Sequence, residues 1–249
     1  MCSLIVLHRP YHEWPLLLGG NRDEMRDRPW SPPGRHWEDR PEVVAGLDRV
    51  AGGSWFGIND DGVVAVAMNR MGTLGPQAGK RSRGELVLEA LDHAEAEQAA
   101  NALADLETQN YRAFNVFIGD PVSAYWVRHS GAGSAQVHKI SPGLHMLAAT
   151  DLDDLENPRV RTYLPRFREA PTPDPVAGDW TGWQELLASR WHPEDEPYAG
   201  MNLDLPIGFG TVCSQLVAIP RYPRYEPPPL FLFAAGPPDR VPFEPVDLS

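Results

Sequence analysis

Two groups of residues near the start of the chain could do chemistry: Cys2, directly after the initiator methionine, and the run Asn21-Arg22-Asp23-Glu24. Methionine aminopeptidases remove Met1 when the next side chain is small, as that of cysteine is. Removal would leave one residue that carries both a thiol and a free α-amine. With a pKa of about 7.7–8.0, this amine suits a thiol of pKa about 8.5 as its base. Cys2 is therefore a candidate nucleophile, and the alternative is an ordinary residue on a frayed strand end.

The sequence around these residues predicts a hairpin that would carry both groups. Leu4 to Leu7 is a continuous apolar run, typical of a strand buried on both faces, and Pro15 to Leu18 predicts a second strand after a polar turn. The tetrapeptide follows the second strand. Four charged or amide side chains directly after a buried strand need partners, solvent or a cleft.

Strand alternation divides the tetrapeptide between two faces. Asn21 and Asp23 would share one face, and Arg22 and Glu24 the other. We expect Asn21 and Asp23 to face the chemistry, and Arg22 and Glu24 to brace the strand end. The alternative is an ordinary charged strand end.

A second buried strand also delivers polar residues at its end. Val63 to Met68 is apolar and β-branched, and the pair Asn69-Arg70 follows it directly. Asn59 to Gly62 precedes it as a hairpin turn in which Gly62 would take a positive φ.

Hydrophobic periodicity predicts the remaining elements. Ser82 and Glu85 match a capping box at the start of a helix, a second helix is expected from about Glu95 to Glu107, and Arg26 to Pro41 predicts a long surface loop. Further strands are expected as a meander over Phe114–Ile118, Ala124–Val127, Gln136–Ile140 and Leu144–Ala149, and later over Gly210–Ile219 and Leu230–Ala234, with helices over Arg159–Phe167 and Thr181–Trp191. Many strands with two helix pairs indicate helices that cover antiparallel sheets, an α+β arrangement.

The composition describes an ordinary globular protein. The chain has 249 residues, of which 42% are hydrophobic and 22% charged, so a single domain over residues 1–249 is expected. A formal charge of -12 argues against nucleic acid or an anionic membrane as the main partner. Two cysteines make neither a disulfide framework nor a zinc-finger pattern, so no metal is expected. No apolar run is long enough to span a bilayer, and a cytoplasmic location is the expectation.

Several segments, in the same order along the chain, resemble the NRDE family, which is also called the transport and Golgi organisation protein 2 family. The resemblance is carried by Met1-Cys2 with the first hairpin, Asn21 to Glu24, Gly53 to Asn59, Val64 to Arg70, Ser82 to Leu86 and Asp151 to Arg159.

This resemblance implies the αββα fold of N-terminal nucleophile hydrolases, a four-layer sandwich of two antiparallel sheets between helix layers. It also implies a distant similarity to bile-salt hydrolases and penicillin V acylases. Cys2 matches the nucleophile of those enzymes, Asp23 the carboxylate that orients the thiol and the α-amine, and Asn69 an amide of the oxyanion hole. The implied activity is hydrolysis of a non-peptide amide bond in a small molecule, with no cofactor.

The chain departs from the acylase pattern at two places. The acylases carry an arginine three residues before the aspartate, where this chain has Gly20, and Arg22 offers a charge at a different position. Their second oxyanion-type asparagine falls near Thr150-Asp151, where a carboxylate would repel a developing oxyanion. Asp151 therefore points elsewhere, or the chemistry differs from amide hydrolysis.

Residues with supporting roles complete the predicted site. We expect Asn21, Arg22, Arg70 and Asp151 to bind substrate or to support the catalytic residues.

A second hypothesis is a non-catalytic protein that binds haem or takes part in trafficking or secretory organisation, as the same resemblance implies. Its candidate haem ligands are Cys2, His8, His12, His129 and His145, although no c-type haem spacing is present.

Overall fold

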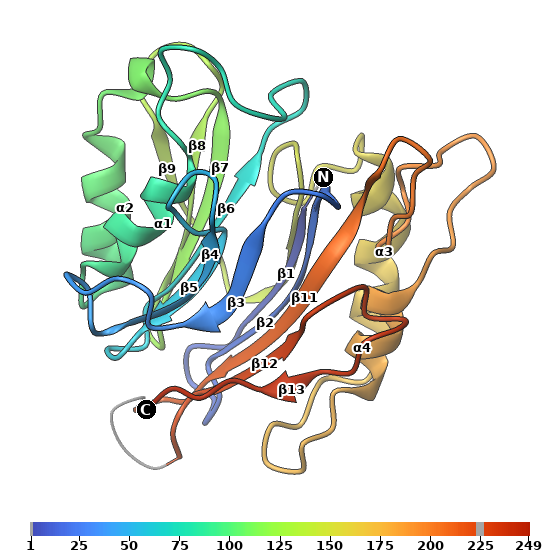
Figure 1. The fold of residues 1–249 in the computed structure, drawn as a ribbon. Helices are drawn as coiled ribbons and strands as arrows, with labels where there is room; N and C mark the ends of the chain where they lie inside the picture. The colour runs from blue at the N-terminus through green and yellow to red at the C-terminus, as the bar shows by residue number, and fades with distance from the viewer. Residues whose placement is uncertain (1, 223–226) are drawn as a thin grey trace.

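The computed structural model describes residues 2–222 and 227–249, which form two antiparallel sheets and four α-helices (Figure 1). Sheet A contains, in spatial order, β10 (Gly143–Leu147), β1 (Ser3–His8), β2 (Leu16–Met25), β11 (Phe209–Ile219), β12 (Leu230–Ala234) and β13 (Glu244–Pro245). Sheet B contains β3 (Trp30–Gly34), β4 (Val43–Asp48), β5 (Phe56–Asn59), β6 (Val64–Asn69), β7 (Phe114–Gly119), β8 (Ala124–His129) and β9 (Gln136–Lys139). The helices are α1 (Gly84–Leu91), α2 (Ala96–Ala104), α3 (Pro158–Glu169) and α4 (Thr181–Ala188), and a short 3-10 helix, η1, spans Thr108–Asn110.

The sheets and helices form four layers. Helices α1 and α2 cover the outer face of sheet B, α3 and α4 cover the outer face of sheet A, and the inner faces of the sheets pack together (Figure 1). This arrangement confirms the predicted α+β class and the αββα sandwich. Among the helices that the structure describes, none has the length and apolar character needed to cross a membrane.

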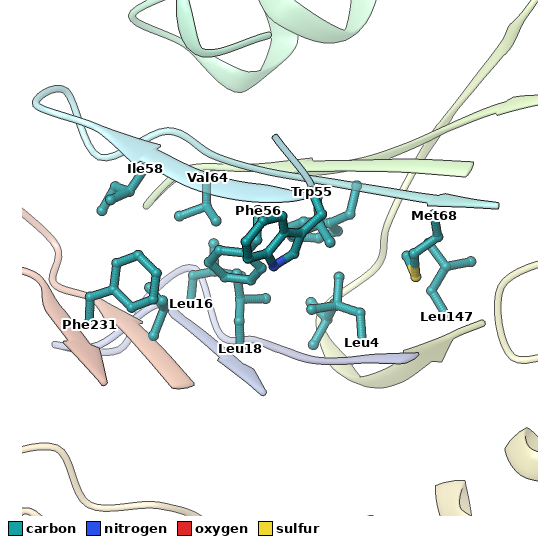
Figure 2. Close-up of a cluster of buried hydrophobic side chains, with 14 of the residues drawn as sticks. Leu4, Leu16, Leu18, Trp55, Phe56, Ile58, Val64, Met68, Leu147 and Phe231 are labelled. Carbon is teal, nitrogen blue, oxygen red and sulfur yellow. The ribbon is translucent and has the colours of Figure 1, made fainter. Parts of the chain in front are cut away.

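Alternation along β2 shows how the sequence builds this layering. Leu16 and Leu18 point into the core between the sheets (Figure 2). Leu17 packs on the other face, with residues of α3 and α4. All three side chains are fully buried. A strand covered on both faces is apolar throughout, which explains the continuous hydrophobic runs of β1 and β2.

The predicted opening hairpin is present, but its second strand is longer than expected. β2 continues through the tetrapeptide to Met25, because β11 pairs with it along its whole length. The register places Thr211 opposite Asp23 and Cys213 opposite Arg22, with a bulge between Thr211 and Cys213. Bulges often re-aim side chains beside functional sites, and this one lies opposite the tetrapeptide.

Two local predictions about strands were wrong. The expected loop from Arg26 to Pro41 contains β3, which pairs with the unpredicted strand β4. The expected strand Leu144–Ala149 does not extend the meander, because β10 crosses to sheet A and pairs with β1. β3 contains two prolines, which are typical of a loop, whereas β10 and β1 lie far apart in sequence, so local periodicity identified neither pairing.

The predicted capping box at Ser82 is also absent. Helix α1 begins at Gly84, and the Ser82 hydroxyl accepts a hydrogen bond from Gly84 N at 3.2 Å. A Cβ on Gly53 would lie 2.5 Å from the carbonyl carbon of Gly84, and Ser54 N donates to Gly84 O at 3.0 Å. This close backbone contact requires glycine at both Gly53 and Gly84, the latter being the first residue of the helix.

Candidate active site

A cleft of about 300 Å³ opens between the two sheets at the end of the sandwich where β1 begins. Its lining includes all three residues predicted to be catalytic, namely Cys2, Asp23 and Asn69. Cys2 directly precedes β1, Asp23 lies in β2 and Asn69 in β6, so both sheets contribute to one site. We refer to this space as the Cys2 cleft.

The Cys2 thiol lies on the cleft side of sheet A. Its Sγ donates a hydrogen bond to the backbone carbonyl of Asp23 over 3.8 Å. Ser3 pairs with Asn21 in the β1–β2 register, so the next position sets Cys2 opposite Arg22, and opposed side chains share a face. Burial and the negative charge of Asp23 raise the pKa of the Cys2 thiol. The thiol is therefore protonated near neutral pH and needs a base before it can act as a nucleophile.

The Asp23 carboxylate is buried beneath the strand, on the side of the helices. Its Oδ2 accepts a hydrogen bond from Arg159 Nη1 at 2.8 Å, and its Oδ1 accepts one from Thr211 Oγ at 2.7 Å. Burial alone would raise its pKa, but the positive charges of the N-terminus and of Arg159, together with these hydrogen bonds, lower the pKa of Asp23 below its usual range. The group is thus a fixed negative charge directly behind Cys2.

Asn21 and Arg22 lie on opposite faces of β2, as alternation predicts. Arg22 is on the face toward the cleft, and Asn21 is on the face toward the helices. The amide nitrogen of Asn21 donates to the carbonyls of Leu187 and Met201 at 2.9 and 3.0 Å, on the helix side. The Arg22 guanidinium lines the cleft, with its central carbon 4.1 Å from the centroid of the Trp55 ring. Contrary to the expectation for these two residues, Arg22 lines the cleft and Asn21 does not.

An ion-pair cluster holds Arg22 and the cleft edge in position. Arg22 Nη2 lies 3.4 Å from Asp48 Oδ2, and Arg28 Nε donates to the same oxygen at 2.8 Å. Glu24 is also at the cleft, 4.0 Å from Arg22 and 3.8 Å from Arg28. Glu24 thus has an electrostatic role at the cleft edge in addition to its place in β2.

Asn69 reaches the cleft from the opposite sheet. It is the last residue of β6, where its backbone still pairs with Phe114 of β7, and its side chain is half-buried. Its side-chain amide can offer an N–H donor to a ligand in the cleft.

Arg70 and Asp151 lie outside the lining of the cleft. Arg70 Nη2 donates to Asp151 Oδ1 at 2.6 Å, and Arg128 pairs with the other carboxylate oxygen. Arg70 Nη1 also donates to Asn115 Oδ1 at 2.7 Å, which joins the end of β6 to β7. Asp151 therefore points away from the cleft, and its charge is neutralised by two arginines; direct contact of either residue with substrate is not supported.

Sequence reasoning missed the residues that hold Asp23 in place. Arg159 occupies the first turn of α3, where its charge opposes the helix macrodipole. An arginine in the first turn of a helix needs a carboxylate partner if it is buried. Its unfavourable position in the helix was the feature of the sequence that could have indicated a partner for Arg159. Thr211 left no such signal, because its orientation depends on the bulge in β11.

The candidate haem histidines do not converge. His8 and His129 are buried in strands, His12 accepts a hydrogen bond from Trp14 N, and His145 contacts Asp153. In the described ranges 2–222 and 227–249, no histidine lines the Cys2 cleft. Of the proposed ligands only Cys2 does, and its raised thiol pKa disfavours the thiolate that would bind iron. These residues do not fit a haem site, so no step is assigned to haem.

Comparison with solved structures agrees with this fold. A Caenorhabditis elegans orthologue of N-acylethanolamine-hydrolysing acid amidase superposes with a TM-score of 0.60 and 11% identity, over 91% of this chain and 94% of that chain. A cysteine-to-alanine mutant of the conjugated bile acid hydrolase from Clostridium perfringens superposes with a TM-score of 0.50 and 10% identity, over 99% and 97%. At these identities the likeness concerns the fold, which is that of N-terminal nucleophile hydrolases.

Sequence comparison identifies the family. No curated protein sequence matches the chain. The family model described as TANGO2, Transport and Golgi organisation 2, matches residues 1–177, which include β1, β2, β6 and Arg159. The chain therefore belongs to the Transport and Golgi organisation 2 family, on an N-terminal nucleophile hydrolase fold.

Proposed function

We propose that this protein is an N-terminal-cysteine amidohydrolase that cleaves a non-peptide amide bond through a Cys2 thioester. The observation that carries the proposal is the position of Cys2: its thiol lines the cleft, opposite Asn69, and the buried Asp23 carboxylate lies behind it. The two structural neighbours are named as an acid amidase and a bile acid hydrolase, which supports the same class of reaction.

The first half of the reaction forms the thioester. Removal of Met1 frees the α-amine of Cys2, which accepts the Sγ proton as the sulfur attacks the substrate carbonyl carbon. The electron pair of the carbonyl moves to its oxygen, and Asn69 donates a hydrogen bond to that oxyanion. Collapse of the intermediate breaks the C–N bond, and the ammonium returns its proton to the leaving amine.

The second half releases the acid. The α-amine takes a proton from a water molecule as the water oxygen attacks the thioester carbonyl. The C–S bond then breaks, and the ammonium returns the proton to the leaving sulfur, which gives the carboxylic acid, the thiol and the free amine. The negative charge of Asp23 favours the ammonium form during each proton transfer, because it lies behind the same residue and remains ionised.

The mechanism requires a free α-amine on Cys2, and this requirement can be tested. Two samples are made from a cleavable fusion, one beginning with Cys2 and one with a single extra glycine before it, and intact mass verifies each terminus. We expect only the first sample to hydrolyse fluorogenic acyl amides and to gain the mass of the acyl group in a rapid quench. Equal activity in both samples would overturn the α-amine as base.

Variants of the two cysteines test separately whether Cys2 is the nucleophile. Cys2→Ala should lower kcat/KM by at least about a thousandfold, since it removes the nucleophile. Cys213→Ala is the matched control, because the Cys213 thiol is fully buried in the core between the sheets and burial raises its pKa. Full activity of Cys2→Ala on every hydrolysed amide would refute the proposed nucleophile.

A further inference from the structure

The Cys2 cleft has a charge opposite to that of the protein. The whole chain carries a formal charge of -12. In the cleft lining, basic residues outnumber acidic ones by two to one. The basic residues are Arg22, Arg28, Lys80, Arg81, Arg83 and Arg112, and the acidic residues are Asp23, Glu24 and Asp48.

The three carboxylates are already engaged by cations on their own side of the cleft. Asp48 pairs with Arg22 and Arg28, and Glu24 lies within 4.0 Å of both arginines. Asp23 is paired with Arg159, which is outside the lining. On the opposite wall Arg81 is paired with Glu85, whereas Lys80, Arg83 and Arg112 form no ion pair with a carboxylate among the described residues.

The opposite wall is the loop between β6 and α1, held by Arg83 and Arg112. Arg83 Nη1 donates to Thr73 O at 2.8 Å, and Arg112 Nη1 donates to the carbonyls of Leu74 and Gly75 at 2.9 and 3.0 Å. These acceptors are neutral, so both positive charges persist. Burial, and next the charge of Arg112, lower the pKa of Arg83 to about 10, so it stays protonated at neutral pH.

Arg22 adds a hydrogen-bond donor on the wall of the cleft that sheet A forms. Its side chain is only 4% exposed, and its Nη1 has no hydrogen-bond partner among the described residues. A buried guanidinium N–H without an acceptor is costly, and an anionic ligand oxygen would satisfy it.

We propose that the Cys2 cleft binds an anionic group of its substrate, a carboxylate or a phosphate, with Arg22 on one wall and Arg83 and Arg112 on the other. This inference rests on the proposed amidohydrolase function, and it defines the substrate class as anionic amides. Clefts lined by one sign of charge concentrate ligands of the opposite sign by about 10-fold to 1000-fold, and salt weakens the effect.

Matched substrate pairs test the proposal. In one pair the acyl group carries the charge: the 4-carboxybutanoyl amide of 7-amino-4-methylcoumarin against its methyl ester. In the other the leaving group carries it: the butanoyl amides of 5-amino-2-nitrobenzoate and of 4-nitroaniline. We expect the anionic member of at least one pair to have a kcat/KM higher by about tenfold or more at low ionic strength. Competition by inorganic phosphate against acetate at equal ionic strength then distinguishes phosphate from carboxylate.

Variants connect this preference to the arginines. Arg112→Gln should reduce the anion preference several-fold, and Arg112→Lys should retain most of it. Lys80→Gln is a second neutralisation for the case that Arg112→Gln does not fold, because the Lys80 ammonium contacts only the carbonyl of Gln109 among the interactions described. Arg168→Gln, an exposed arginine on α3 outside the cleft, is the matched control and should leave the preference unchanged. Equal kcat/KM within both pairs would overturn the proposal.

Binding to an inactive variant separates this proposal from the proposed reaction. Calorimetry with Cys2→Ala measures binding of the intact substrates without turnover. Binding of the anionic members alone supports the anion site even if the wild-type protein hydrolyses nothing, in which case only the amidohydrolase proposal fails. Hydrolysis of neutral and anionic members at equal rates supports the reaction and overturns the anion site.

Discussion

Arg159 and Asp23 form a buried ion pair, 136 residues apart in sequence, that joins helix α3 to the strand behind Cys2. The Nη1–Oδ2 distance is 2.8 Å, and the two side chains are 4% and 0% exposed. Both residues lie outside the core between the sheets, so the pair connects the helix layer to the strand that forms the cleft floor.

Loss of Arg159 should destabilise the fold. Arg159→Met leaves a buried carboxylate without its guanidinium partner, and breaking such a pair costs about 3–5 kcal/mol of unfolding free energy. Urea unfolding at neutral pH measures the change. Arg161→Met is the matched control on the same helix, since Arg161 is exposed and should change stability by about 0.5 kcal/mol or less. Equal midpoints for the two variants would contradict the assigned role.

Removal of the Asn69 amide should slow turnover without unfolding the protein. Asn69→Ala removes a donor from the proposed oxyanion site, which typically costs about 100-fold to 1000-fold in kcat. Steady-state kinetics on a hydrolysed amide, with a thermal melt of the same sample, measures both properties. Asn101→Ala, an exposed asparagine on α2, is the control and should match the wild-type protein. An unchanged kcat in Asn69→Ala would exclude the amide from the reaction.

His145 should make stability depend on pH. Its Nδ1 lies 2.6 Å from Asp153 Oδ2 and its Nε2 lies 3.0 Å from Ser141 O, two acceptors that both favour ring N–H donors. The hydrogen bond and charge of Asp153 raise the pKa of His145 against the opposing effect of burial. The ring is therefore an imidazolium at moderately acidic pH, so it is not a base for the Ser141 hydroxyl at 3.4 Å.

The sign of this dependence follows from the raised pKa. The contribution of His145 is complete below its unfolded pKa of about 6.5 and is lost as pH rises through the higher folded pKa. The slope of unfolding free energy with pH in that window is at most about 1.4 kcal/mol per unit from this group. Urea unfolding across the window should show a shallower fall in His145→Asn than in the wild-type protein; identical slopes would disprove the assignment.

Gly46 should be required for the position of the Trp55 ring. A Cβ on Gly46 would lie 2.3 Å from a ring carbon of Trp55, which stacks against Arg22 in the cleft. Gly46→Ala should therefore cost about 1–3 kcal/mol of stability and weaken substrate binding as the ring and Arg22 shift. Gly34→Ala in the neighbouring strand is the control, since its Cβ would meet only His36 at 3.5 Å. Matching melting temperatures and KM values in the two variants would disprove this coupling.

Local patterns in the sequence predicted the elements that are defined by their own residues. The apolar run from Val63 to Met68 and the alternation from Gly210 to Ile219 both correspond to strands, β6 and β11. Strand β4 escaped prediction because its residues, Val43 to Asp48, have little alternation of polar and apolar side chains, and pairing with the adjacent strands β3 and β5 stabilises it.

The sequence by itself determined the family through its motifs and the α+β class through its periodicity, and the family resemblance implied the four-layer fold and a site at Cys2, Asp23 and Asn69. The tertiary structure decided which face of β2 lines the cleft, that Arg159 and Thr211 hold Asp23, and that Arg83 and Arg112 face Arg22. Alternation assigns side chains to two faces of a strand, but only the packing of the second sheet and the helices determines which face is the cleft and which is buried.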